Sequence, residues 1–360
     1  MLGLRITLLL SSVMLLISGL WVGLVRLGWQ LPNSISVMQH GPLMVAAFFA
    51  TLIALERAVG LGKAWVYVSP VLLAIGGILA MTPLNPSLGI LFFIAGSAVY
   101  LASATHLFFL QKADFTFVMA LGAFALFLAN ILWAFGVPLN IIVMYWASYL
   151  VLIISGERLE LSRFVKKPKI ALQSFVASVI IDIIGLIVML ISPNLGLRIV
   201  AIAFLIMAIW LLYFDIAKVN IKQSGAYRFM AAGLLAGYFW LAVAAIWFLF
   251  VGLKSAGPNY DAPLHAIFVG FTFSMVFAHA PVIFPAVLKL KITFSKVLYL
   301  PLIALHASLL VRLIGDLYSH ELRYWGGMIS AISIVLYFFL TLTVTLYSTL
   351  TRAKPAVKKA

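Results

Sequence analysis

Residues 261 to 281 read DAPLHAIFVGFTFSMVFAHAP, an almost entirely apolar run that nevertheless carries two histidines, His265 and His279. About 20 apolar residues are enough to cross the hydrocarbon core of a bilayer as a helix. Ionisable side chains are costly inside such a run and usually face a site or a partner. The stretch therefore predicts a membrane-spanning helix that carries a functional site.

The rest of the chain repeats this apolar pattern. Hydrophobic residues make up 65% of the 360 residues and charged residues only 9%, which is far outside the usage of soluble domains. Within a bilayer, helices are the economical way to satisfy the backbone of each apolar segment. We therefore expect one all-α, polytopic membrane domain over residues 1–360, ending in a basic cytoplasmic tail at residues 351–360. The twelve predicted spans lie at about 4–27, 37–59, 64–82, 87–110, 115–136, 139–156, 169–192, 195–217, 227–252, 263–288, 297–319 and 325–350.

The charge of the chain is strongly positive, with 24 lysines and arginines against 9 aspartates and glutamates. These basic residues lie in short loops between apolar spans, where the positive-inside rule explains them and nucleic-acid binding is not needed. The rule places both termini in the cytoplasm and the protein in the inner or plasma membrane, with the lipid bilayer as its partner. The basic residues that fall toward the outer side are Arg26, Arg198, Lys254, Arg312 and Arg323.

The absence of cysteine narrows the possible chemistry. The chain has no cysteine, so disulfides, iron–sulfur clusters and cysteine nucleophiles are excluded. Any metal must be bound by histidine, carboxylate or methionine. No nucleotide-binding loop and no Ser/His/Asp arrangement is recognisable either.

The depth of each histidine can be estimated from the rise of 1.5 Å per residue in an α-helix. His265 and His279 are 14 residues apart, which is only about 40° short of four full turns and about 21 Å of rise, so they are predicted to share one face. His279 precedes Lys289 by ten residues, and His306 follows Lys296 by ten. We therefore expect His279 and His306 to lie at one depth on neighbouring helices.

Imidazole is the only strong neutral metal ligand available in this chain. His40 and His265 both lie at the outer side. In this membrane setting a haem is a better candidate than a bare ion, because a porphyrin is apolar and packs between helices while two imidazoles hold its iron. The competing interpretation is that a buried histidine only hydrogen-bonds a neighbouring helix. That simpler interpretation is favoured for His106 and His320, which lie near the interfaces.

Three other polar residues fit around such a site. Arg312 and Asp316 stand at i and i+4, so they can pair with each other, and Arg312 can also bind a haem propionate. Asp182 lies in the middle of a span with no basic residue near it in the sequence. Its carboxyl group is therefore either protonated or paired across helices, and it serves proton transfer or a structural hydrogen bond.

Two segments carry a family resemblance. QHGPLMVAAFFATLIALERAVGL at residues 39–61 and LHAIFVGFTFSMVFAHAPVIFPAVL at residues 264–288 resemble the NnrS family, a group of haem- and copper-containing membrane proteins linked to nitric oxide and nitrosative stress. The same segments are similar, more distantly, to subunit I of haem-copper oxidases and nitric oxide reductases.

The resemblance implies a fold and a site. Its fold would be three arcs of four helices, in which spans two, six and ten are equivalent. His40 and His265 would be axial ligands of a haem b with Arg312 near its propionates, while His279 and His306 would bind copper or a second haem. A haem-dependent oxidoreductase of this kind would use an electron donor and a small gas, nitric oxide or oxygen. Span six has no histidine and span seven lacks an adjacent histidine pair, so a complete oxygen-reducing centre is not expected.

The alternative function is a proton- or cation-coupled transporter. Twelve helices are common among transporters, and Asp182, Glu56 and the histidines could relay protons or bind a cation. The paired halves with matched broken helices that mark many transporters are not found in the sequence.

Overall fold

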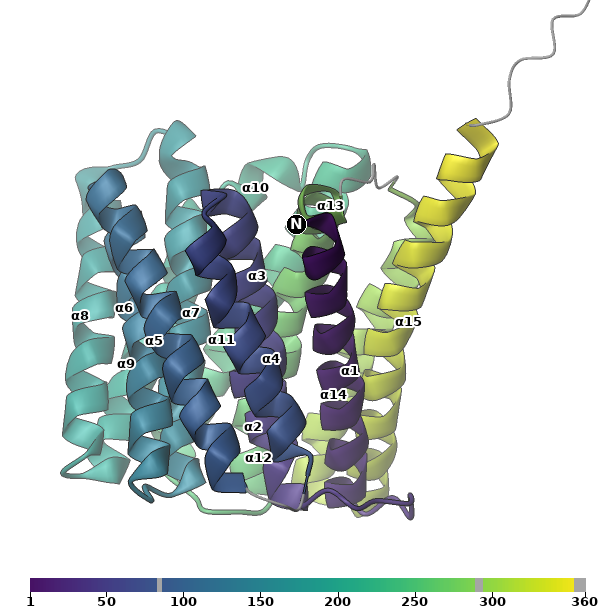
Figure 1. Cartoon of the computed structure of the whole chain (residues 1–360). Helices are drawn as coiled ribbons and strands as arrows, with labels where there is room; N and C mark the ends of the chain where they lie inside the picture. Colours follow the sequence, from purple (N-terminus) through teal and green to yellow (C-terminus); the bar gives the residue numbers. More distant parts are fainter. Residues whose placement is uncertain (83–85, 289–293, 353–360) are drawn as a thin grey trace, which may run out of the picture.

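The computed structural model describes residues 1–82, 86–288 and 294–352, and all the regular structure within those ranges is helical. The helices run up and down side by side, and neighbours in the sequence pack against each other (Figure 1). The long helices are α1 (Leu2–Leu27), α4 (Val68–Ala80), α5 (Pro86–Leu110), α6 (Asp114–Ala134), α7 (Leu139–Leu161), α8 (Lys169–Met189), α9 (Pro193–Phe214), α11 (Gly225–Val251), α13 (Ser274–Leu288), α14 (Tyr299–Tyr318) and α15 (His320–Arg352).

Shorter helical pieces complete or join several spans. The second span is built from η1 (Val37–Gln39), α2 (His40–Pro42), η2 (Leu43–Phe49) and α3 (Ala50–Leu61), and the tenth from α12 (Pro258–His265), η5 (Ala266–Phe273) and α13. The remaining short helices are η3 (Ala64–Tyr67), η4 (Ser162–Phe164), α10 (Ala217–Asn220) and η6 (Lys296–Leu298).

The described residues contain eleven helical segments that are long and apolar enough to cross a membrane. The predicted third span is present as a shorter apolar helix, Ala64–Ala80. Each predicted span thus coincides with a helix, and the all-α, polytopic fold is confirmed. The chain is a multi-pass membrane protein. Lys289, Lys291 and most of the predicted tail lie outside the described residues.

Three spans occupy the centre of the bundle. The share of buried residues is 83% in Leu139–Phe164, 78% in Pro258–Pro281 and 72% in Val37–Leu61, whereas it is 56% or less in the other eight candidate spans. These are the sixth, tenth and second spans, the ones that an arrangement of three arcs makes equivalent. Chemistry that needs shelter from lipid and water is therefore best placed on these three spans.

The second and tenth spans share an irregularity. Each contains a π-helical segment, η2 and η5, in which the backbone hydrogen bonds run from residue i to i+5. The segment η2 begins three residues after His40, and η5 begins directly after His265. π segments are rare and occur often at functional sites. Their position beside these histidines therefore indicates a functional site at this end of the bundle.

Candidate functional site

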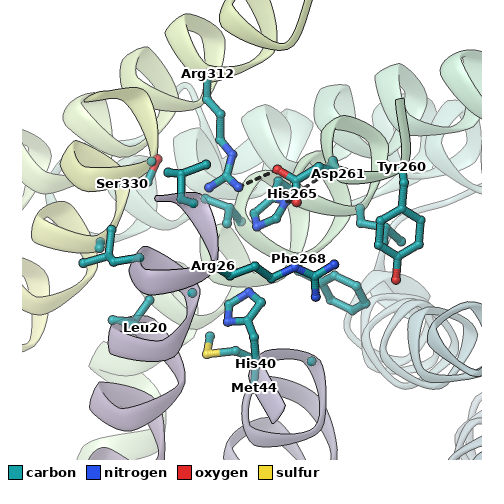
Figure 2. Close-up of a pocket in the computed structure, with 18 of the residues that line it drawn as sticks. Leu20, Arg26, His40, Met44, Tyr260, Asp261, His265, Phe268, Arg312 and Ser330 are labelled. Atoms are coloured by element: carbon teal, nitrogen blue, oxygen red, sulfur yellow. Dashed lines mark hydrogen bonds and ion pairs between the residues drawn. The ribbon is translucent and has the colours of Figure 1, made fainter. Parts of the chain in front are cut away.

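A cavity of about 330 Å³ opens where α1, α2, α12, α14 and α15 come together. Its volume is within the range of pockets that hold a cofactor or other small ligand. Much of its wall is apolar. Figure 2 shows His40 and His265 on facing walls, with Arg26 extending across the view between them.

His40 and His265 are the pair that the sequence places at the outer side. Their ring centres are 6.2 Å apart and their planes are inclined by only 10°. The two histidines are 225 positions apart in the chain, and the second and tenth spans bring them to the same cavity. The expected meeting of His40 and His265 is therefore present in the structure.

Backbone hydrogen bonds hold both rings in place. His40 Nδ1 donates to the carbonyl oxygen of Gly19 at 2.9 Å, and His265 Nδ1 donates to that of Asp261 at 2.8 Å. This leaves Nε2 of each ring as the nitrogen with an available lone pair. A histidine that ligates a metal typically has its other nitrogen fixed in this way.

Two glycines of α1 allow His40 to sit where it does. A Cβ atom at Gly23 would stand 2.6 Å from Cε1 and 2.7 Å from Nδ1 of His40, and one at Gly19 would stand 2.6 Å from the sulfur of Met44. Both positions therefore need a residue without a side chain. The sequence signal for this contact is a G-x-x-x-G spacing in the first span, which is typical of closely packed membrane helices. Neither Gly19 nor Gly23 is among the residues predicted above for the site.

An ion-pair network surrounds His265. Arg312 donates to the carboxylate of Asp261 at 2.6 Å, and Arg323 reaches the same oxygen at 3.3 Å. The other carboxylate oxygen of Asp261 is 3.4 Å from Nδ1 of His265. Asp316 pairs with Arg323 at 2.7 Å. The direct pair expected between Arg312 and Asp316 therefore does not form among the described contacts, because each residue has a closer partner on another helix.

The charges near the cavity do not balance. Arg26, Arg312 and Arg323 line it, and Arg312 and Arg323 pair with the carboxylates of Asp261 and Asp316. One positive charge is therefore in excess. In addition, Nε of Arg312 is buried without a hydrogen-bond partner among the described residues. The site is suited to a ligand that carries negative charge at one edge.

His279 and His306 have separate surroundings. Nδ1 of His306 accepts a 2.9 Å hydrogen bond from Trp240, and its Nε2 lies 3.5 Å from Ser274 Oγ. Nδ1 of His279 donates to the carbonyl oxygen of Met275 at 2.8 Å. No hydrogen bond or ring contact joins the two histidines in the part of the chain that the structure describes. Their joint binding of copper or a second haem stays a prediction.

The two histidines of the tenth span lie at two cavities. His265 lines the large one, and His279 lines a smaller one. The π-helical segment η5 lies between them. That His265 and His279 share one face of the helix stays a prediction.

The sequence matches the model of one protein family over most of its length. A family model described as "Domain of unknown function (DUF8744)" matches residues 5–346. This chain belongs to that family. No curated protein matches the chain, and no solved structure does.

The remaining polar residues of this DUF8744 protein have simple partners. His106 packs edge-on against Trp65, and His320 stacks on Tyr324. Asp182 accepts a 2.9 Å hydrogen bond from Ser148 on the central helix α7. In the described ranges, no group of three or more histidine, aspartate or glutamate side chains is arranged to hold a metal ion.

The smaller cavity of this DUF8744 chain measures about 60 Å³ and lies between the second, sixth and tenth spans. Its ionisable lining residues are Glu56, Glu157 and His279, one from each central span. It lies toward the end of the bundle that holds α13 and the N-terminus, whereas α2 and α12 lie at the other end (Figure 1).

Proposed function

We propose that this protein is a haem-binding electron-transfer protein of the membrane, in which His40 and His265 ligate one b-type haem. The observation that carries the proposal is the facing pair of imidazoles. Two metal–nitrogen bonds of about 2 Å, together with the two ring radii, amount to roughly 6 Å between ring centres. The observed 6.2 Å agrees with that spacing.

The hydrogen bonding and shape of the site also fit a haem. Both Nδ1 atoms are bound to backbone carbonyls, so each ring keeps Nε2 for the iron. Apolar side chains such as Leu24, Val45 and Phe268 line the cavity and suit the face of a porphyrin. The bare backbone at Gly23 gives the ring of His40 its place against α1.

The excess positive charge fits the propionates. A ferric haem with two ionised propionates has a net charge of −1, which would balance the one positive charge in excess around Asp261 and Asp316. Arg312 has its Nε without a partner in the described structure, so it can donate to a propionate while it keeps Asp261. Arg26 is exposed, so its long side chain can leave the space between the two rings and pair with the second propionate.

A haem at this site would supply one-electron oxidation and reduction. If His40 and His265 both bound the iron, they would leave it no free position for a gas, which would favour electron transfer over gas binding. Binding of nitric oxide or oxygen and a role in nitrosative stress rest on the NnrS resemblance alone. Copper or a second haem has no comparable support, because His279 and His306 have separate surroundings.

We also infer the orientation from charge. Most helix ends near the N-terminus of the bundle carry lysine or arginine, whereas Arg26, Arg312 and Arg323 lie at the cavity. By the positive-inside rule, the end of the bundle that holds the N-terminus faces the cytoplasmic side of a cell membrane. The His40–His265 cavity then faces the opposite side, where an electron donor or acceptor would approach.

The test is an absorption spectrum of the purified protein in oxidised and reduced form, combined with iron analysis and haem extraction. We expect a Soret band, sharp low-spin bands on reduction and one iron per chain. Protein that is folded, purified from cells supplied with haem precursors, and free of both haem and iron would overturn the proposal.

A further inference from the structure

We propose that the smaller cavity is a proton-binding site, in which Glu56 and Glu157 together hold one exchangeable proton. The site lies between the three central spans, at the end of the bundle opposite to His40 and His265. The proposal does not rest on haem binding, because none of the residues that carry it lines the larger cavity.

The charges around the smaller cavity do not balance. Two carboxyl groups, Glu56 and Glu157, line the cavity, and Arg57 reaches Glu157 at 3.5 Å. The neighbouring Arg158 does not supply a second positive charge, since it forms a two-pronged ion pair with Asp215 at 2.9 Å. An unpaired carboxylate is costly in a low-dielectric interior, so the cluster needs one more positive charge.

A proton is better able than a metal ion to supply the missing positive charge. No three metal-ligating side chains converge anywhere in residues 1–82, 86–288 and 294–352, so a bound metal ion has no ligand set here. A proton needs only one carboxylate oxygen and a hydrogen-bond partner. The cavity of about 60 Å³ is large enough for a few water molecules, each of which needs at least about 10–15 Å³, so a proton can be passed between the groups.

His279 and Tyr149 are further groups that can exchange protons. His279 lines the same cavity, and its Nε2 is buried without a hydrogen-bond partner in the described structure. Tyr149 lies within electrostatic range of Glu56 and Glu157, its ring meets that of Tyr100 edge to face, and its hydroxyl is also buried without a partner in the described structure. Buried polar atoms that have no partner in the described structure indicate that water or a proton completes their hydrogen bonds.

The site is also within reach of solvent. The side chain of Glu157 is 28% exposed and that of Arg57 is 18% exposed. The other ionisable groups near the carboxyl pair are Arg158 and Glu160, which follow Glu157 on α7. Glu157 is therefore a group through which the carboxyl pair can exchange its proton with water.

Infrared difference spectroscopy on the full-length protein tests the proposal through the C=O stretch of protonated carboxyl groups. We expect a band that shifts in D₂O, responds to a pH step, and is lost in Glu56→Gln or Glu157→Gln. Asp182→Asn is the matched control, because Asp182 is a buried carboxyl on another helix, bound to Ser148. Its replacement should leave the pH-dependent band unchanged.

The conservative variants Glu56→Asp and Glu157→Asp show whether the loss of the band comes from misfolding. Each keeps a carboxyl group, so it should shift the frequency of the band without abolishing it. The proposal is overturned if the pH-dependent band survives in both glutamine variants, or if it disappears only in Asp182→Asn. Metal analysis that finds a stoichiometric ion, lost in Glu56→Gln, would also overturn it.

Discussion

Asp261 accepts a 2.6 Å hydrogen bond from Arg312, and this contact joins the start of the tenth span to α14. Arg323 at the start of α15 reaches the same carboxylate oxygen at 3.3 Å. Asp261 also lies one helical turn before His265, whose Nδ1 is bound to its backbone carbonyl. A single carboxylate thus holds three helices around one of the two cavity histidines.

Asp261→Asn is expected to destabilise the protein. The side chains of Asp261 and Arg312 are only 13% and 10% exposed, and removing one partner of a buried ion pair costs about 3–5 kcal/mol. The measurement is unfolding of the purified protein in a mild detergent, by heat or denaturant. Glu321→Gln is the control, because Glu321 is exposed in the same region. Equal stability of the two variants would contradict the structural role given to Asp261.

His40→Ala and His265→Ala are each expected to remove the low-spin haem spectrum, because each replacement takes away one of the two axial ligands. Absorption and electron paramagnetic resonance spectra of the purified variants provide the measurement. His320→Ala should keep the wild-type spectrum, since His320 is exposed and stacks on Tyr324. A full haem signal in either cavity variant would rule out the proposed ligand pair.

Gly23→Ala is expected to weaken haem binding while the helix bundle remains folded. The added methyl group would stand 2.6 Å from the ring of His40, so the ring must move away from its position. Changes around a metal-ligating histidine typically cost about 10–100-fold in affinity, and a haem titration should show a loss of that size. Gly3→Ala is the control, because Gly3 lies on the same helix and no atom lies within 4 Å of the Cβ that the variant adds. If both variants bind haem equally well, Gly23 has no positioning role.

Arg158→Met is expected to destabilise the protein by about 3–5 kcal/mol, since it leaves Asp215 buried without its partner. The two residues form hydrogen bonds of 2.9 Å, and their side chains are 3% and 0% exposed. The double variant Arg158→Met with Asp215→Leu should regain a large part of this stability, because it removes both charges. Unfolding of the single and double variants measures the difference. A double variant that is less stable than the single one would contradict this expectation, and would show that the hydrogen bonds of Asp215 with Ser162 and Ala217 outweigh the cost of its unpaired charge.

The helix positions were predictable because twenty apolar residues in a row leave the chain few alternatives in a bilayer. The meeting of His40 and His265 was also predictable, since both lie near the outer end of their spans. Asp261 was missed although it stands in the stretch DAPLH, four residues before His265. That i, i+4 spacing was a usable signal, whereas the pairing of Arg323 with Asp261 depends on how α12, α14 and α15 pack.

Whether His279 and His306 meet could not be predicted from depth alone. Counting residues gives the height of a side chain along a span but not its direction, which depends on how the helices pack. The turn counted from His265 to His279 also assumes that every residue in between is α-helical, and the eight π-helical residues of η5 lie in that interval. Nothing in the apolar sequence AIFVGFTF distinguishes a π segment from a regular helix, because all of its positions are buried or half-buried in either form.

The two π segments have a consequence for how relatives of this chain should be aligned. A π segment commonly arises where one residue is inserted into a regular helix, so a relative with a straight second or tenth span would be one residue shorter there. Aligners that forbid gaps inside membrane spans would then match His40 or His265 correctly and shift everything after it by one position. Family alignments should therefore permit a single-residue gap within residues 43–49 and 266–273.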